Sequence, residues 1–159
     1  MKGKKDMAIR QIRFRNDEIL SKKARLIEKI DDKVKELAQD MLDTMYENDG
    51  IGLAACQVGM LKALVVYDVS YIDEKKPVKK PVVMINPKIT ARSKSMVTVE
   101  EGCLSFPNVF EKVDRHEKVT VEYLDLEGKK QVKRVKGIES VCVQHEVDHL
   151  NGIVFLDYV

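Results

Sequence analysis

The chain has 159 residues, a length that suits one compact domain and leaves too little sequence for two hydrophobic cores. Its 28 Lys and Arg residues nearly balance its 26 Asp and Glu residues, and the basic residues are scattered along the chain. This distribution argues against a nucleic-acid-binding face and against an electrostatic funnel for acidic substrates. We therefore expect one domain over residues 1–159 that binds no nucleic acid.

The chain begins with a basic stretch and continues into a helical pattern. The stretch MKGKKDMAIRQIRFR is basic, and we expect residues 1–7 to form a flexible leader. Charged residues then separate a series of apolar ones at helical spacing: Ile30, Val34, Leu37, Met41 and Met45. With Asp31 and Asp32 favouring its start, this pattern predicts an amphipathic helix that ends near the sequence ENDG at residues 47–50.

Short runs rich in β-branched residues follow the predicted helix. ALVVYDV at residues 63–69 and VVMINP at residues 82–87 are too short for ordinary helices, so they predict buried strands. The charged segment at residues 71–81 contains two prolines and predicts a mobile surface loop. Residues 118–136 alternate between apolar and polar, turn at Glu127 and Gly128, and alternate again, which predicts a β-hairpin.

The sequence IESVCVQHEVDHL at residues 138–150 has a helical pattern. The side expected to face the interior of the protein carries Ile138, Val141, Cys142, His145 and His149. Together, these elements predict an α+β fold, with largely antiparallel β-strands packed around a C-terminal helix and with an N-terminal amphipathic helix.

The cysteines and the hydropathy of the chain predict where in the cell the protein is located. The three cysteines, Cys56, Cys103 and Cys142, are odd in number and occur without a secretory signal, so we expect reduced thiols, no disulfide and a cytoplasmic location. No apolar run approaches the roughly 20 residues that span a bilayer. We therefore expect a soluble protein with no membrane partner.

His145, Glu146 and His149 form the pattern H-E-x-x-H, which is the strongest signal in the chain. On a helix the two histidines lie one turn apart on one face, so both imidazoles can reach one cation. Glu146 points about 100° around the helix from His145, so we expect its carboxylate to flank the cation and accept a proton from water. The competing interpretation is a pair of core histidines beside an unrelated glutamate. We expect a metal-binding helix.

A third ligand has to come from elsewhere in the chain. Cys142 shares the helix face with the histidines, but it would stretch three donors over about 10 Å of helix rise. His116 lies in a charged context that predicts exposure to solvent. Cys103 lies in a shaped loop, EEGCLSFP, that can meet the helix from outside, and it is the favoured candidate. An open fourth position would then make the site catalytic, whereas a fourth protein ligand such as Asp157 would make it structural.

Three separated segments carry a more specific pattern: GIGLAACQVG at residues 50–59, EGCLS at residues 101–105 and QHEVDHLNG at residues 144–152. In this order they resemble the signature segments of the peptide deformylases. Nearly the whole chain fits, from IRQIRFRNDEIL to FLDY. The resemblance implies that Cys103 completes a ligand set with His145 and His149.

The resemblance also implies roles for residues around the metal. Gln57 and the backbone N–H of Leu104 would donate hydrogen bonds to the formyl oxygen of the substrate, which fits the charge that develops there. Gly52 would offer main-chain contacts to the peptide. The expected walls of an apolar slot for the methionine side chain are Ile51, Val141 and Cys142.

The implied activity is removal of the N-formyl group from the formylmethionine of newly made polypeptides, with release of formate. One divalent metal ion is implied, with Fe²⁺ favoured by the resemblance and with Zn²⁺, Ni²⁺ or Co²⁺ compatible with the ligands. The partners would be N-formylmethionyl nascent peptides, with a transient ribosome contact, and we expect a monomer. The rival hypotheses are a metallopeptidase that cuts internal bonds and a non-enzymatic protein with a structural zinc site.

Overall fold

The computed structural model describes residues 8–70 and 78–159, and within these ranges the protein has an α+β fold. The expected leader at residues 1–7 and most of the expected loop at residues 71–81 lie outside the described residues. Helix α1 spans Asp32–Glu47 and helix α2 spans Gly137–Leu150. Short 3₁₀ turns occur at Glu18–Ser21, Ala55–Val58 and Phe155–Tyr158. No helix in the described ranges is long and apolar enough to cross a membrane.

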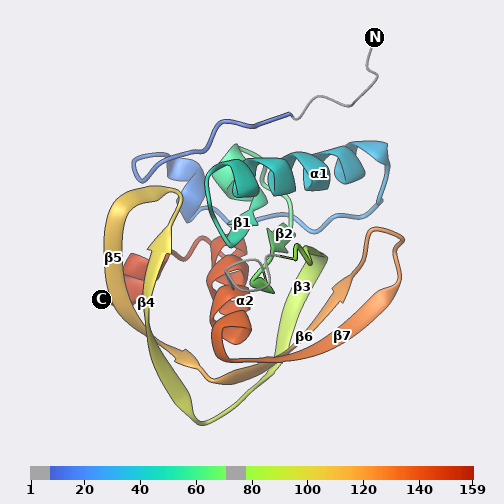
Figure 1. Ribbon diagram of the computed structural model, residues 1–159. Helices are drawn as coiled ribbons and strands as arrows, with labels where there is room; N and C mark the ends of the chain where they lie inside the picture. The colour runs from blue at the N-terminus through green and yellow to red at the C-terminus, as the bar shows by residue number, and fades with distance from the viewer. Residues whose placement is uncertain (1–7, 71–77) are drawn as a thin grey trace.

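The strands form one sheet and one long hairpin, and every pairing among them is antiparallel. The sheet has the order β1-β2-β3-β6-β7 and is built from Gly52–Ala54, Leu64–Tyr67, Val82–Arg92, Lys118–Leu124 and Lys130–Lys136. The hairpin is built from β4 (Met96–Cys103) and β5 (Phe106–His116). Helix α2 lies between this hairpin and the β6–β7 hairpin, with α1 across the far side of β1 and β2 (Figure 1).

The predicted strands are confirmed, but β3 is longer than predicted and β1, β4 and β5 were not predicted. Strand β2 lies inside the predicted run, and β6 and β7 form the predicted hairpin. Strand β3 runs well past residue 87, because register shifts against β6 absorb the irregularity around Asn86 and Pro87 and let pairing resume. Strands β4 and β5 were not predicted, because much of the hairpin is exposed and its mixed charges mask the alternation.

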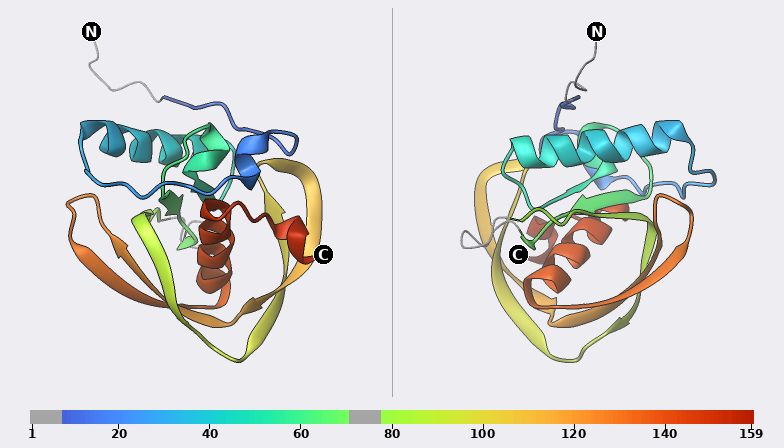
Figure 2. Two further views of the ribbon diagram at one scale, coloured as in Figure 1. Left: turned by 180° about the vertical axis from the view of Figure 1, so that it is seen from behind. Right: turned by 45° about the vertical axis from the view of Figure 1, so that its right-hand side comes forward.

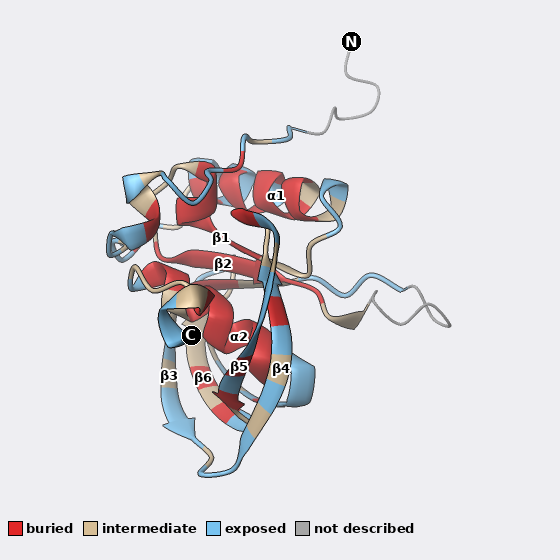
Figure 3. Ribbon diagram, turned by 90° about the vertical axis from the view of Figure 1, so that its left-hand side faces the viewer, coloured by how far each residue is buried: buried red, intermediate tan, exposed pale blue. Residues whose placement is uncertain are grey.

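Helix α1 confirms the predicted amphipathic helix. The Asp31 carboxylate accepts a hydrogen bond of 3.0 Å from the N–H of Val34, which caps the helix start. Leu37, Met41 and Met45 are buried with Val34 on one face, while the other face is exposed (Figure 3). Full burial of each such side chain contributes about 1.5–3 kcal/mol to the free energy of folding.

Strand β2 separates two hydrophobic layers. Leu64 and Val66 pack with the buried face of α1, while Val65 and Tyr67 pack with residues of α2. Because both faces of this strand are covered, its sequence is continuously apolar rather than alternating. The layer on the α2 side is the one that contains the candidate functional residues.

Helix α2 departs from the prediction that a single face is buried. It packs against β1, β2, β3, β5, β6 and β7, and residues on all its sides are buried (Figures 2 and 3). Ile138 was predicted to face the interior, but its side chain is 41% exposed. It lies in the first turn of the helix, directly after strand β7.

Candidate metal centre and its cleft

The turn between β4 and β5 brings a cysteine to helix α2. Cys103 is the last residue of β4, and it pairs with Phe106 across the tight turn at Leu104 and Ser105. The predicted shaped loop is therefore a hairpin turn. It places the Cys103 Sγ 3.4 Å from the Nε2 of His149 in helix α2.

The donor atoms of Cys103, His145 and His149 all lie within 4.8 Å of one another. A tetrahedral metal ion with bonds of about 2.0–2.3 Å separates its ligand atoms by about 3.3–3.7 Å. The three side chains therefore reach ligand geometry with shifts of about 1 Å or less. In residues 8–70 and 78–159 no other group of three His, Cys, Asp or Glu side chains is arranged in this way.

The other candidate ligands lie elsewhere. Cys142 is buried with its thiol directed to the carbonyl of Ile51, and burial raises its pKa well above the ordinary value. His116, the last residue of β5, was predicted to be solvated but is half-buried. Its Nδ1 lies 2.7 Å from the carbonyl oxygen of Ser93. Asp157 is exposed, and its carboxylate accepts a hydrogen bond from the N–H of Val154. Asp157, offered as a fourth ligand in the structural-zinc hypothesis, is not among the clustered donors of the described residues.

Glu146 lies beside the three donors and is itself buried. Among the described residues its Oε1 has no hydrogen-bond partner. Burial raises the pKa of Glu146 to about 7, against the opposing charge of His145. A carboxylate with this pKa can accept and return a proton near neutral pH. Gly52 allows it to sit there, because a Cβ at that position would clash with the Glu146 Oε2 and lie 3.0 Å from the Cys142 Sγ.

The two histidines differ in their surroundings. Burial, together with the positive charges of His145 and Arg115, holds the pKa of His149 well below its ordinary value. Burial also lowers the pKa of His145, but the charge of Glu146 and hydrogen bonds to Cys103 and Glu101 outweigh it and hold that pKa well above the ordinary value. His149 therefore offers a neutral imidazole, while His145 gives up a proton when a cation binds.

Glu101 and Arg115 were not predicted, yet they hold His145 in place. The His145 Nδ1 lies 2.8 Å from the Glu101 Oε1, and Arg115 donates to both Glu101 oxygens at 2.7 and 2.9 Å. Burial alone raises the pKa of Glu101, but the hydrogen bonds from Arg115 and His145 lower it below the ordinary value. Glu101 lies two residues before Cys103 in strand β4, and because that strand was not predicted, Glu101 was not assigned to the site.

The C-terminal turn adds to this network. Arg115 also donates to the Asp148 Oδ2 at 2.6 Å, and the hydroxyl of Tyr158 donates to the same oxygen at 2.8 Å. The guanidinium of Arg115 lies 4.7 Å from the centre of the Tyr158 ring. Such a fully paired cluster fixes side-chain orientation, because each buried charge has a partner.

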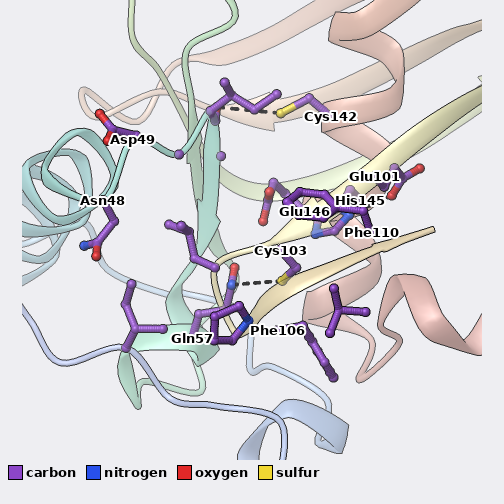
Figure 4. Close-up of a pocket in the computed structure, with 18 of the residues that line it drawn as sticks. Asn48, Asp49, Gln57, Glu101, Cys103, Phe106, Phe110, Cys142, His145 and Glu146 are labelled. Carbon is purple, nitrogen blue, oxygen red and sulfur yellow. Dashed lines mark hydrogen bonds and ion pairs between the residues drawn. The ribbon is translucent and has the colours of Figure 1, made fainter. Parts of the chain in front are cut away.

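Gln57 lies on the opposite side of Cys103 from the helix (Figure 4). Its Oε1 accepts a hydrogen bond of 3.0 Å from the N–H of Ala54, which sets the orientation of the amide. Its Nε2 therefore points into the site, 3.0 Å from the Ser105 Oγ and 3.4 Å from the Cys103 Sγ. The longer contact with sulfur is the weaker of the two.

A cleft of about 770 Å³ opens above the three donors. Every residue predicted to contact substrate lines it, together with the candidate base and two of the three donors: Gly52, Ile51, Val141, Cys142, Gln57, Leu104, Cys103, His145 and Glu146. Residues 9–12 and Phe14 of the N-terminal segment also line the cleft, and their role was not predicted.

The site combines a thiol and two imidazoles with a buried carboxylate, and it lies at the base of an open cleft. This combination is typical of metal-dependent hydrolases. The sequence model of the polypeptide deformylase family matches residues 9–159. The peptide deformylase of Finegoldia magna is 50% identical over 155 residues, which cover 96% of this chain and 91% of that protein. That of Rhizobium meliloti is 44% identical over 153 residues, covering 96% and 86% respectively.

The fold agrees with these sequence matches. The crystal structure of peptide deformylase from Thermotoga maritima superimposes with a TM-score of 0.88 at 36% identity, and the match covers 95% of this chain and 97% of that one. The chain therefore belongs to the polypeptide deformylase family. It is a hydrolase that removes the N-formyl group from newly made polypeptides.

Proposed function

We propose that Cys103, His145 and His149 hold one divalent metal ion and that the residues around them carry out deformylation. The donor set supports this, because it combines one sulfur with two imidazoles at ligand-like separations. The buried Glu146 Oε1, which lacks a partner among the described residues, also suits a site that takes up a cation and water.

The identity of the ion is part of the proposal. Thiolate and imidazole ligands accept Fe²⁺, Zn²⁺, Ni²⁺ and Co²⁺, and the family resemblance favours Fe²⁺. Such an ion supplies Lewis acidity, which polarises the formyl oxygen and lowers the pKa of a bound water. Glu101 orients His145 toward the ion by accepting its Nδ1 proton, and Arg115 fixes Glu101 in turn.

Glu146 is the proton carrier in this mechanism. Its carboxylate accepts a proton from the attacking water as the oxygen adds to the formyl carbon. The protonated Glu146 then returns that proton to the amine nitrogen as the carbon–nitrogen bond breaks. The products are formate and a peptide with a free N-terminal methionine.

Gln57 and the backbone N–H of Leu104 stabilise the formyl oxygen while it becomes negative. The Gln57 Nε2 is already aimed at the site, so it exchanges its long contact with the Cys103 Sγ for the substrate oxygen with little reorganisation. Leu104 directly follows Cys103 in the hairpin turn, which keeps its N–H beside the donors. Both donors are neutral, which suits an oxyanion that exists only during the reaction.

The methionine side chain enters the apolar part of the cleft. Ile51, Val141 and Cys142 form its walls, and Gly52 offers main-chain contacts to the peptide. Because Gly52 lacks a Cβ, the Glu146 carboxylate can lie against its backbone, beside the place where the peptide would bind.

The wider setting follows from the substrate. We propose one catalytic domain over residues 1–159 that acts as a monomer in the cytoplasm, on N-formylmethionyl nascent peptides, with transient contact to the ribosome. Sedimentation with purified ribosomes and size-exclusion chromatography test these statements.

The convergence of Cys103 from the hairpin with the two histidines of α2 carries the proposal. The direct experiment incubates protein purified without oxygen with formyl-Met-Ala-Ser and with the unformylated peptide. We expect formate from the first and no reaction with the second. Cleavage of internal bonds would instead support a metallopeptidase, and metal-loaded protein that releases nothing would support a structural metal site.

A further inference from the structure

The opening of the cleft is surrounded by exposed apolar side chains. Four of the ten large apolar residues that are exposed in the described ranges line it: Ile9, Phe14, Phe110 and Ile138. Single exposed apolar residues are common on protein surfaces, but a group around one opening marks a binding surface. We call these four residues the apolar rim.

Phe110 belongs to this rim and lies beside the candidate metal centre. Its side chain is 62% exposed, although it stands on strand β5 (Figure 4). A Cβ on Gly102 would lie 2.7 Å from the Cε1 of the Phe110 ring. The ring therefore rests against the backbone of the residue that precedes Cys103, and only glycine permits this contact. An exposed ring is thus held one residue away from a proposed ligand.

The cleft is larger than the group that reacts in it. Its volume of about 770 Å³ is typical of sites for drug-sized ligands, so it has room for residues beyond formylmethionine. The methionine occupies the slot at Ile51, Val141 and Cys142, and the rest of the peptide has to leave toward solvent across the rim. The side chains after methionine therefore meet the apolar rim.

We propose that Phe110 is a specificity-determining residue, whose ring receives an apolar side chain from one of the two residues that follow the substrate methionine. This inference rests on the proposed function, because it places the formyl group at the candidate metal centre. An apolar side chain covers exposed ring surface when it binds, whereas alanine covers little of it. The preferred substrates are thus formyl-Met peptides with a large apolar residue at the second or third position.

The experiment compares kcat/KM for three peptides: formyl-Met-Ala-Ser, formyl-Met-Leu-Ser and formyl-Met-Ala-Leu. For the wild-type protein, we expect one leucine peptide to exceed the alanine peptide by about fivefold, as partial burial of a leucine side chain gives. Phe110→Ala should bring that ratio close to one, and Phe110→Leu, which keeps an apolar surface, should retain most of it.

Met96→Ala is the matched control, because Met96 is an exposed apolar residue of the same hairpin that does not line the cleft. It should leave the ratio as in the wild type. A role of Phe110 in covering Gly102 alone would lower the melting temperature of Phe110→Ala without changing the ratio, and that result would overturn the inference. Equal kcat/KM for all three peptides in the wild type would overturn it as well, while leaving deformylation intact. No formate from any peptide would overturn the proposed function and this inference with it.

Discussion

The two α-helices bury their residues in different ways. Helix α1 has one buried face, on which the polar residues are Asp40 and Thr44, and its opposite face is exposed. Helix α2 is buried on nearly all sides, and its buried polar residues are Ser140, Gln144, His145, Glu146 and His149. The more deeply buried helix is therefore the one that buries more polar side chains.

This difference in buried polar side chains shows which helix carries the catalytic residues. Burying polar groups stabilises nothing by itself and needs partners. In α2, Gln144 donates to the carbonyl of His116, and His145 pairs with Glu101, so partners from the β4–β5 hairpin satisfy them. Glu146 and His149 are the exceptions, since the Glu146 Oε1 and the His149 Nδ1 have no hydrogen-bond partner in the described part of the chain. We therefore expect changes in α2 to alter catalysis and changes in α1 to alter stability alone.

The largest effect is expected at Glu146. Glu146→Gln keeps the size of the side chain but removes the carboxylate that accepts the proton, so formate release should fall by about 10²- to 10⁴-fold. Metal content should stay near the wild-type value, because Cys103, His145 and His149 are unchanged. Activity and metal content have to be measured on one preparation handled without oxygen. Loss of the metal would make Glu146 a ligand or a support for one, and full activity would remove it from the mechanism.

A core change in α1 should give the opposite result. Met41 is fully buried, so Met41→Ala should lower the free energy of unfolding by about 2–5 kcal/mol. At a temperature where the variant is folded, formate release per folded molecule should match the wild type. Denaturant unfolding and activity assays at low temperature check both parts. Lost turnover in a fully folded, metal-loaded variant would contradict the separation of the two helices.

A smaller effect, on the pH dependence of stability, is expected at Asp68, which is hydrogen-bonded to Tyr46 of α1. Burial alone raises the pKa of Asp68, but hydrogen bonds from Ser70 and from Tyr46 of α1 outweigh it and hold that pKa below 3.8. A lowered pKa means that the carboxylate stabilises the fold above pH 4 and loses this contribution as the pH falls through the folded-state pKa. The wild type should be more stable than Asp68→Asn at pH 7, and the gap in melting temperature should narrow below pH 4. A gap that stays constant down to pH 2.5 would argue against this role.

The same contrast explains how far the sequence could be interpreted. The pattern of α1 was readable because one face is buried, so Leu37 and Met41 stand out against charged neighbours. The H-E-x-x-H pattern was readable because its spacing alone puts His145 and His149 on one turn. In α2, however, burial on nearly all sides means that the helical pattern does not identify one buried face, and Ile138 was assigned to the wrong environment.

The residues that support the candidate site were harder to find, because they come together only in three dimensions. Arg115 lies far from Glu101 and Asp148 in the sequence, and a charged strand residue is typically exposed. The pairing of β4 with β5 is what buries it. The placement of Cys103 beside the helix was implied by the family resemblance, whereas the residues alone left other ligands open.

The measurement that tests the central claim most directly is metal content per chain in three cysteine variants purified without oxygen. The central claim is that Cys103, from the hairpin, completes the ligand set of α2. Cys103→Ser should lose most of its metal, because a neutral hydroxyl is a poor replacement for a thiolate. Cys56→Ser and Cys142→Ser are the matched controls and should keep close to the wild-type content, since both thiols are buried outside the cluster. If Cys142→Ser lost the metal and Cys103→Ser kept it, the ligand assignment would be wrong.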